Sequence, residues 1–214
     1  MKFIKRIQYN SPVILTYALL SLAALGVGRL TGGESTRLIF SVYRGPLTDP
    51  LTYVRIFTYV IGHADLSHYL NNFLIILLIG PMLEKKYGSR DIIFMILITA
   101  AVTGAVNTAF FDTALLGASG IVFMFILLSS FVNLKKGRIP VTLILVMSVY
   151  IGREVIDGIT LNDNISRFGH ILGGLCGALL GFFLNRKELF SREEAIKTKE
   201  VSDTGDENEN ESGI

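Results

Sequence analysis

The stretch of sequence that decides the fold runs from Gly62 to Leu83 and reads GHADLSHYLNNFLIILLIGPML. Its second half is almost wholly apolar, whereas its first half carries two histidines and two asparagines. An apolar run of this kind is typical of a membrane-spanning helix, and ionisable groups inside such a helix are costly. The stretch therefore predicts a spanning helix over residues 67–83 whose polar end needs a functional explanation.

The composition of the whole chain points to the same environment. Of the 214 residues, 50% are hydrophobic and only 18% are charged, whereas an ordinary soluble domain has about 25% charged residues. These proportions exclude the disordered, collagen-like, coiled-coil and ordinary soluble classes. The single cysteine, Cys176, excludes an internal disulfide and a cysteine-rich zinc site.

Six apolar segments are long enough, or nearly so, to cross a hydrocarbon core of about 30 Å as helices. They cover residues 12–28, 67–83, 91–111, 117–133, 140–156 and 168–184. The first follows three basic residues and has the look of a signal peptide. No clear cleavage site follows it, however, and five further spans do. We therefore predict an all-α membrane protein with six transmembrane helices, the first of which is retained.

The basic residues predict the orientation of these helices. Fourteen lie in the two tails and in the 2–3 and 4–5 connections, and six lie on the other side. Because basic residues favour the cytoplasmic side, both termini are expected to be cytoplasmic. The Lys and Arg residues thus lie where topology requires them, and nothing favours binding to nucleic acid.

Two regions outside the spans have their own character. Residues 188–214 hold nine of the eighteen acidic residues and few apolar ones, which predicts a disordered cytoplasmic tail. The core, residues 1–187, then carries a net charge of +8. The connection between the first two spans, about residues 29–66, contains Pro46, Pro50 and several apolar stretches. We expect it to be a structured piece lying at the outer membrane interface.

The polar residues of the spans fall at one depth. With the N-terminus inside, the second, fourth and sixth helices all run from outside to inside, so their first turns share the outer side. His68, Ser119 and His170 each lie near the start of one of these helices. Asn72 follows His68 at i+4 and therefore shares its helix face. The fourth segment is short, which predicts a water-accessible recess above Ser119.

Glycines predict which helices touch. In the sixth segment Gly173, Gly177 and Gly181 repeat every four residues on the face that carries His170. Such faces allow close helix contact in lipid. A contact between the fourth and sixth helices would bring Ser119 and His170 together.

These residues have the chemistry of acyl transfer. A serine hydroxyl needs a base to take its proton, and His170 is the candidate for Ser119. The oxyanion would be stabilised by the Ser119 backbone N–H at the helix start and by donors from His68 and Asn72. No acidic residue is clearly placed to orient the base, since Asp112 and Asp157 are candidates only by lying on the outer side. A Ser–His dyad is therefore preferred to a triad.

At this point the chain resembles the rhomboid intramembrane serine proteases over about residues 50–184. The motifs that carry the resemblance are HADLSHYLNN (63–72), LEKKYGS (83–89), GASG (117–120) and HILGGLCG (170–177). The order and number of helices also match, so the resemblance implies a six-helix rhomboid-like bundle. It further implies cleavage of transmembrane or juxtamembrane segments of other membrane proteins within a lipid bilayer, with neither a metal nor an organic cofactor.

The resemblance also assigns roles. Ser119 would be the nucleophile and His170 the base, with His68, Asn72 and the Ser119 amide as the oxyanion hole. Four further residues occupy supporting positions of the family. They are Gly117 of the G-x-S-G motif, His63, Phe123, and Glu84, which is the anchor in the 2–3 connection. His63 has a structural reading as well as a supporting one.

There are two departures from the family pattern. Val54-Arg55 stands where the family commonly has Trp-Arg, and Phe123 stands where it often has a Tyr that stacks on the base. Both are expected to affect substrate range or rate rather than the dyad.

Two other functions compete with the protease. One is a catalytically inactive rhomboid-like protein that binds membrane clients, which predicts loss of Ser119 or His170, yet both are present. The other is a small transporter or channel, which predicts charges deep in several spans or repeated broken helices. The sequence leaves the natural substrate and the oligomeric state open. The short N-terminal tail favours a prokaryotic plasma membrane.

Overall fold

The computed structural model describes the chain over residues 10–130, 141, 144–145, 148–149, 152 and 169–183. Regular structure within these residues is helical, apart from an isolated bridge between Val42 and Leu115. The described elements are α1 (Pro12–Leu30), α2 (Glu34–Leu38), α3 (Pro50–Thr58), η2 (Tyr59–Ile61), α4 (Leu66–Tyr87), α5 (Ser89–Phe110), α6 (Ser119–Ser130) and a helix over Gly169–Phe183. The predicted tail over 188–214 lies outside the described residues, and so does most of the predicted span over 140–156.

Three of these helices have the length and composition of membrane spans. The most apolar windows of α1, α4 and α5 have mean hydropathies of 1.8, 1.5 and 2.0. Two shorter apolar helices, α6 and Gly169–Phe183, complete the described bundle. The prediction of an all-α integral membrane protein is therefore confirmed for the part of the chain that the structure describes.

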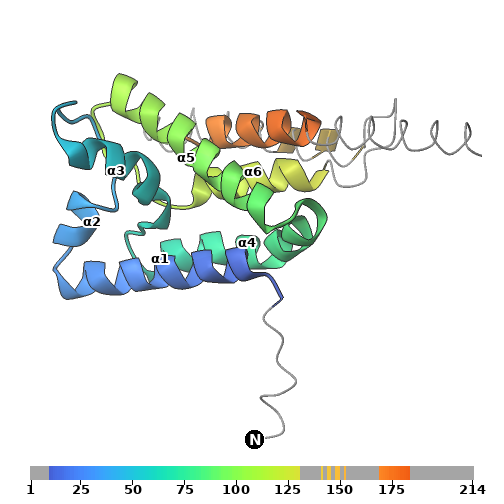
Figure 1. Cartoon of the computed structure of the whole chain (residues 1–214), viewed down its shortest axis with the longest axis horizontal. Coiled ribbons are helices and arrows are strands. Elements are labelled where there is room, and N and C mark those ends of the chain that lie inside the picture. The colour runs from blue at the N-terminus through green and yellow to red at the C-terminus, as the bar shows by residue number, and fades with distance from the viewer. Residues whose placement is uncertain are drawn as a thin grey trace, which may run out of the picture.

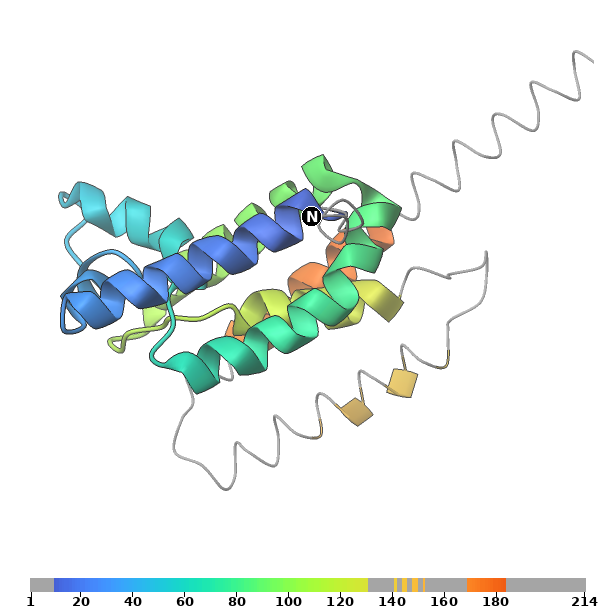
Figure 2. The same ribbon diagram turned by 90° about the horizontal axis from the view of Figure 1, so that it is seen from below.

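The helices pack as a bundle with the 1–2 connection at one end. Figure 1 shows α2 and α3 gathered at the end of the bundle where α1 and α5 finish. The central helix α4 packs against both α1 and α6, and α6 also contacts α5. In Figure 2 α4 and α6 run alongside each other, which brings their first turns to the same side of the bundle.

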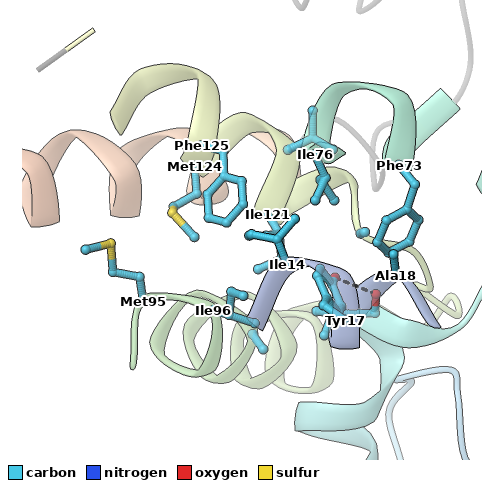
Figure 3. Packing of buried hydrophobic residues seen from close by; sticks show 14 of the residues in the cluster. Ile14, Tyr17, Ala18, Phe73, Ile76, Met95, Ile96, Ile121, Met124 and Phe125 are labelled. Carbon is cyan, nitrogen blue, oxygen red and sulfur yellow. Dashed lines mark hydrogen bonds between the residues drawn. The ribbon is translucent and has the colours of Figure 1, made fainter. Parts of the chain in front are cut away.

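The core of the bundle is made of apolar side chains from four helices. Figure 3 shows Ile14 and Tyr17 of α1 with Phe73 and Ile76 of α4, joined by residues of α5 and α6. Ile14 and Ile76 are fully buried, whereas Leu78, on another face of α4, is 79% exposed. In lipid both faces meet an apolar environment, so close packing rather than exclusion of water selects the inward face.

A buried carboxylate joins three helix ends at the side of the bundle where α1 begins. The Glu84 carboxylate accepts hydrogen bonds from the backbone N–H groups of Val13 and Ile14, both at 3.1 Å, and from the Ser89 hydroxyl at 2.7 Å. Its side chain is nearly inaccessible, with the residue only 5% exposed. A negative group at a helix N-terminus satisfies unpaired donors and interacts favourably with the helix dipole. Glu84, near the end of α4, thus caps the N-terminus of α1.

The connection between α1 and α4 is folded. Asp49 begins α3 by accepting a hydrogen bond from the backbone N–H of Leu51. The buried Arg55 guanidinium pairs with the Asp49 carboxylate at 3.2 Å and donates to the Leu38 carbonyl at 2.8 Å. It also stacks over the Tyr43 ring at 4.6 Å. Arg55 therefore holds α3 against the segment that follows α2.

A second set of contacts ties this connection to the loop before α6. Val42 and Leu115 exchange backbone hydrogen bonds at 2.9 and 2.8 Å. The Asn107 side-chain amide, buried in α5, donates to the carbonyls of Val42 and Thr113, both at 3.2 Å. Because these bonds hold both sides of the loop, the first turn of α6 starts from a fixed position.

Candidate functional site

The first turn of α4 presents the two polar side chains singled out by the sequence. The Asp65 carboxylate caps the helix by accepting a hydrogen bond from the His68 backbone N–H at 2.8 Å. One turn further on, the Asn72 amide donates to the His68 carbonyl at 3.0 Å. An amide carries two N–H donors, and this bond uses only one of them. His68 and Asn72 therefore share one helix face.

Gly117 brings the loop before α6 against this face. Its φ of +118° is one that side-chain-bearing residues rarely adopt. A Cβ atom built at this position would lie 2.7 Å from Nε2 of His68 and 3.9 Å from Nδ2 of Asn72. The backbone N–H of Gly117 donates to the Tyr59 carbonyl at 3.0 Å. Only glycine fits here, because the backbone passes directly over the His68 ring.

Ser119 is the first residue of α6 and is half-buried. The first backbone hydrogen bond of this helix runs from the Val122 N–H to the Ala118 carbonyl at 2.9 Å. N–H groups in the first turn of a helix have no partner within it and lie at the positive end of its dipole. The Ser119 N–H thus belongs to a turn that is suited to an anionic oxygen.

The Gly169–Phe183 helix touches α6 backbone to backbone. A Cβ on Gly173 would overlap the Gly120 carbonyl, with the Gly120 carbonyl carbon 2.7 Å away. A Cβ on Gly177 would likewise lie 2.8 Å from the Met124 Cα. Gly120 in turn faces the Gly169 carbonyl, since a Cβ there would be 3.5 Å from that oxygen. Ser119 and His170 are each one residue away from this contact.

A ring contact shows which face of α6 the His170 side chain follows. The ring centroids of Phe123 and His170 are 4.5 Å apart, at an interplanar angle of 42°. Phe123 lies four residues after Ser119, and residues four apart lie on the same helix face. The half-buried His170 ring therefore lies along the face of α6 that also carries Ser119.

His63 is buried against the ring of His68. It is 1% exposed, and its ring centroid is 5.0 Å from that of His68 and 5.6 Å from that of Phe73. Its Nδ1 atom lies 3.2 Å from the Ile61 carbonyl, which can only accept a hydrogen bond. Burial, followed by the neighbouring His68, lowers the pKa of His63 to about 4. The ring is therefore neutral at pH 7, with its proton on Nδ1.

Of the two acidic residues that could complete a triad, only Asp112 lies within the described residues. The Asp112 side chain is 79% exposed and forms an ion pair with Arg44 at 2.7 Å. Asp157 lies outside the described residues. Within the described part of the chain no group of three His, Cys, Asp or Glu residues could hold a metal ion.

Two residues that support the site were missed in the sequence. The Tyr59 carbonyl orients Gly117, and Asn107 holds the loop before α6. Asn107 carried a usable signal, because an amide inside an apolar segment requires partners. Tyr59 carried none, since any residue has a backbone carbonyl.

Two comparisons with known proteins bear on this arrangement. The family model described as the Rhomboid domain matches residues 50–187. The chain is also similar to RHOMBOID-like protein 4 of Arabidopsis thaliana, with 35% identity over 131 residues. The matched region is 57% of this chain and 32% of that protein, so the chain spans about a third of the length of this relative.

Proposed function

Since this chain belongs to the rhomboid family, we propose that it is an intramembrane serine endopeptidase that hydrolyses peptide bonds in or near transmembrane segments of other membrane proteins. The proposal is supported above all by the backbone contact of α6 with the Gly169–Phe183 helix. That contact lies next to both Ser119 and His170. The Phe123–His170 ring contact adds that the imidazole follows the Ser119 face of α6.

In the proposed reaction, the Ser119 hydroxyl oxygen attacks the scissile carbonyl carbon while His170 takes the hydroxyl proton. The imidazolium then gives this proton to the departing amine as the C–N bond breaks, which leaves an acyl-enzyme. A water molecule attacks the ester with His170 again as the base. The second collapse returns the proton to Ser119 and releases the new carboxyl terminus.

The donors of the proposed oxyanion hole are chosen by asking which N–H groups near Ser119 already donate a hydrogen bond within the protein. The Gly117 N–H is bonded to the Tyr59 carbonyl. We therefore assign stabilisation of the oxyanion to the Ser119 N–H, the second N–H of the Asn72 amide and the His68 ring. Loss of one such donor typically costs about 2.7–4 kcal/mol of transition-state stabilisation.

The proposal includes the membrane arrangement that the basic residues favour. Six spans would have both termini in the cytoplasm, and the folded 1–2 connection would lie at the outer interface. The first turns of α4, α6 and the Gly169–Phe183 helix would then be reached from the outer side. A transmembrane substrate would enter laterally from the bilayer, and water would come from the outer aqueous phase.

The proposal is tested by labelling and cleavage with the full-length protein in detergent. A fluorophosphonate probe should label the wild type and not the Ser119→Ala variant. Cleavage of a transmembrane substrate should be lost in Ser119→Ala and in His170→Ala. Ser129→Ala is the matched control, because Ser129 lies in the same helix with its hydroxyl bonded to the Ile126 carbonyl. Undiminished cleavage by Ser119→Ala would refute the mechanism, and a wild type that is neither labelled nor active would favour a client-binding protein.

A further inference from the structure

A cavity separate from the dyad lies between the end of α1, the 1–2 connection and the segment before α4. Its volume is about 370 Å³. Arg29 from the last turn of α1, Arg37 from α2, and Ser41, His63 and Ala114 are among the residues that line it. The proposed acyl transfer does not use this cavity, although His63 in its wall also contacts the ring of His68.

The charge of the cavity wall favours an anion. Among the described residues that line the cavity, only Arg29 and Arg37 carry a permanent charge, and both are basic. Arg37 pairs with Glu34 at 3.0 Å, but both side chains are more than 60% exposed. An exposed pair of this kind contributes little to stability, because solvent screens it. A phosphate that approaches the cavity can therefore take the place of the Glu34 carboxylate.

The position of the cavity favours a lipid over a dissolved anion. It lies at the final turn of α1, a helix long and apolar enough to cross a membrane, and therefore at the level of the headgroups. Each lining arginine is followed by exposed apolar side chains. Leu30 is 88% exposed, and Leu38 and Ile39 are each 37% exposed. An anionic headgroup at the arginines would leave its acyl chains beside these residues.

We propose that this cavity binds the headgroup of an anionic phospholipid, such as phosphatidylglycerol, whose phosphate lies between Arg29 and Arg37. This binding goes beyond the proposed proteolysis and does not depend on it.

The experiment measures phosphatidylglycerol adducts of the full-length protein in detergent by native mass spectrometry, with phosphatidylcholine as the reference lipid. Wild type should prefer phosphatidylglycerol. Arg29→Gln and Arg37→Gln should each weaken its binding about fivefold, the effect of removing one basic residue near a lipid surface. Glu34→Gln should strengthen binding, because it releases Arg37. Arg44→Gln is the matched control, since Arg44 belongs to the same connection but pairs with Asp112 outside the cavity.

Several outcomes would overturn the proposal. Equal binding of the two lipids, or unchanged phosphatidylglycerol binding in both arginine variants, would remove the headgroup site. Equally tight binding of soluble glycerol phosphate would show an anion site with no lipid component. Competition by an acidic juxtamembrane peptide, without a lipid effect, would assign the cavity to a polypeptide instead. All these variants alter exposed side chains, so unchanged thermal midpoints should show that each protein is folded.

Discussion

Buried polar groups lie in the last turn of α4 and around its start, including the segment that leads into it, and they differ in how completely they are paired. At the end next to α5, the Glu84 carboxylate accepts three hydrogen bonds from groups of α1 and α5. At the start of the helix, the Nε2 atom of His63 has no partner among the described residues, and the Asn72 amide has one donor beyond its bond to the His68 carbonyl. A closed polar cluster stabilises the fold. A cluster with unpaired donors and acceptors can still bind a ligand or a transition state. The comparison therefore distinguishes polar groups that stabilise the fold from polar groups that are suited to function.

The largest effect is expected from a substitution of Gly117, which lies against the incompletely paired polar groups at the start of α4. In Gly117→Ala, the new Cβ would meet the His68 ring, and the positive φ would be strained as well. Because the His68 ring and the loop that leads into Ser119 would have to move apart, we expect cleavage to fall by at least the factor of about 10²–10³ that marks loss of one oxyanion donor. Cleavage kinetics and the thermal midpoint should be measured together. The matched control is Gly26→Ala, since a Cβ on Gly26 meets nothing within 4 Å.

Removing a single donor from these polar groups should have a smaller effect. In Asn72→Ala we expect kcat to fall about 10²–10³-fold with KM nearly constant, because the amide is proposed to act on the transition state only. Asn71→Ala, on the neighbouring face of the helix, is the control. A variant that lowers the thermal midpoint by several degrees while retaining its kcat would place Asn72 in the structural class instead.

Substitution of the fully paired Glu84 should have the opposite result, a loss of stability with little change in activity. In Glu84→Gln the charge is lost, and with it part of the three hydrogen bonds that join α1, α4 and α5. Since hydrogen bonds to a charged group contribute about 1.5–3 kcal/mol each, we expect a loss of that order in the free energy of unfolding. The rate per folded molecule should be nearly unchanged. Lys85→Gln, an exposed neighbour, should change neither quantity.

Near pH 7 the smallest effect is expected from His63, which changes the stability only as the pH falls. Its pKa is about 4 in the folded protein, below the ordinary value of 6.5, because of burial and then the nearby His68. The folded state therefore prefers the neutral ring. The stability linked to this preference is fully present above pH 6.5 and is lost as the pH falls towards 4. His63→Gln should flatten this part of the stability curve in chemical denaturation from pH 7 to 4, and an unchanged slope would contradict the assignment.

The helical class could be predicted from the sequence because it depends on local signals, since apolar runs mark helices. The shared depth of His68, Ser119 and His170 stays a prediction that rests on the basic residues and the span directions that they favour. The small-residue faces correctly suggested that α6 and the Gly169–Phe183 helix touch.

The remaining contacts could not be read from the sequence, since they pair backbone groups far apart along the chain. Nothing local to Tyr59 or Gly117 announces their hydrogen bond, and the Val42–Leu115 bridge joins two irregular segments. The cavity beside Arg29 and Arg37 has the same origin, because it depends on how α2 folds back on α1.

The glycine contact between α6 and the Gly169–Phe183 helix indicates where a spectroscopic probe can be attached. Main-chain atoms set the spacing of the two helices beside Gly120 and Gly173. The opposite face of the Gly169–Phe183 helix therefore takes no part in this contact. Leu175 and Leu179 are about half exposed on that face. A cysteine-reactive fluorophore or spin label at either position would lie about one and a half or two and a half turns from His170, and its signal would report movement of the helix without contacting the reacting groups.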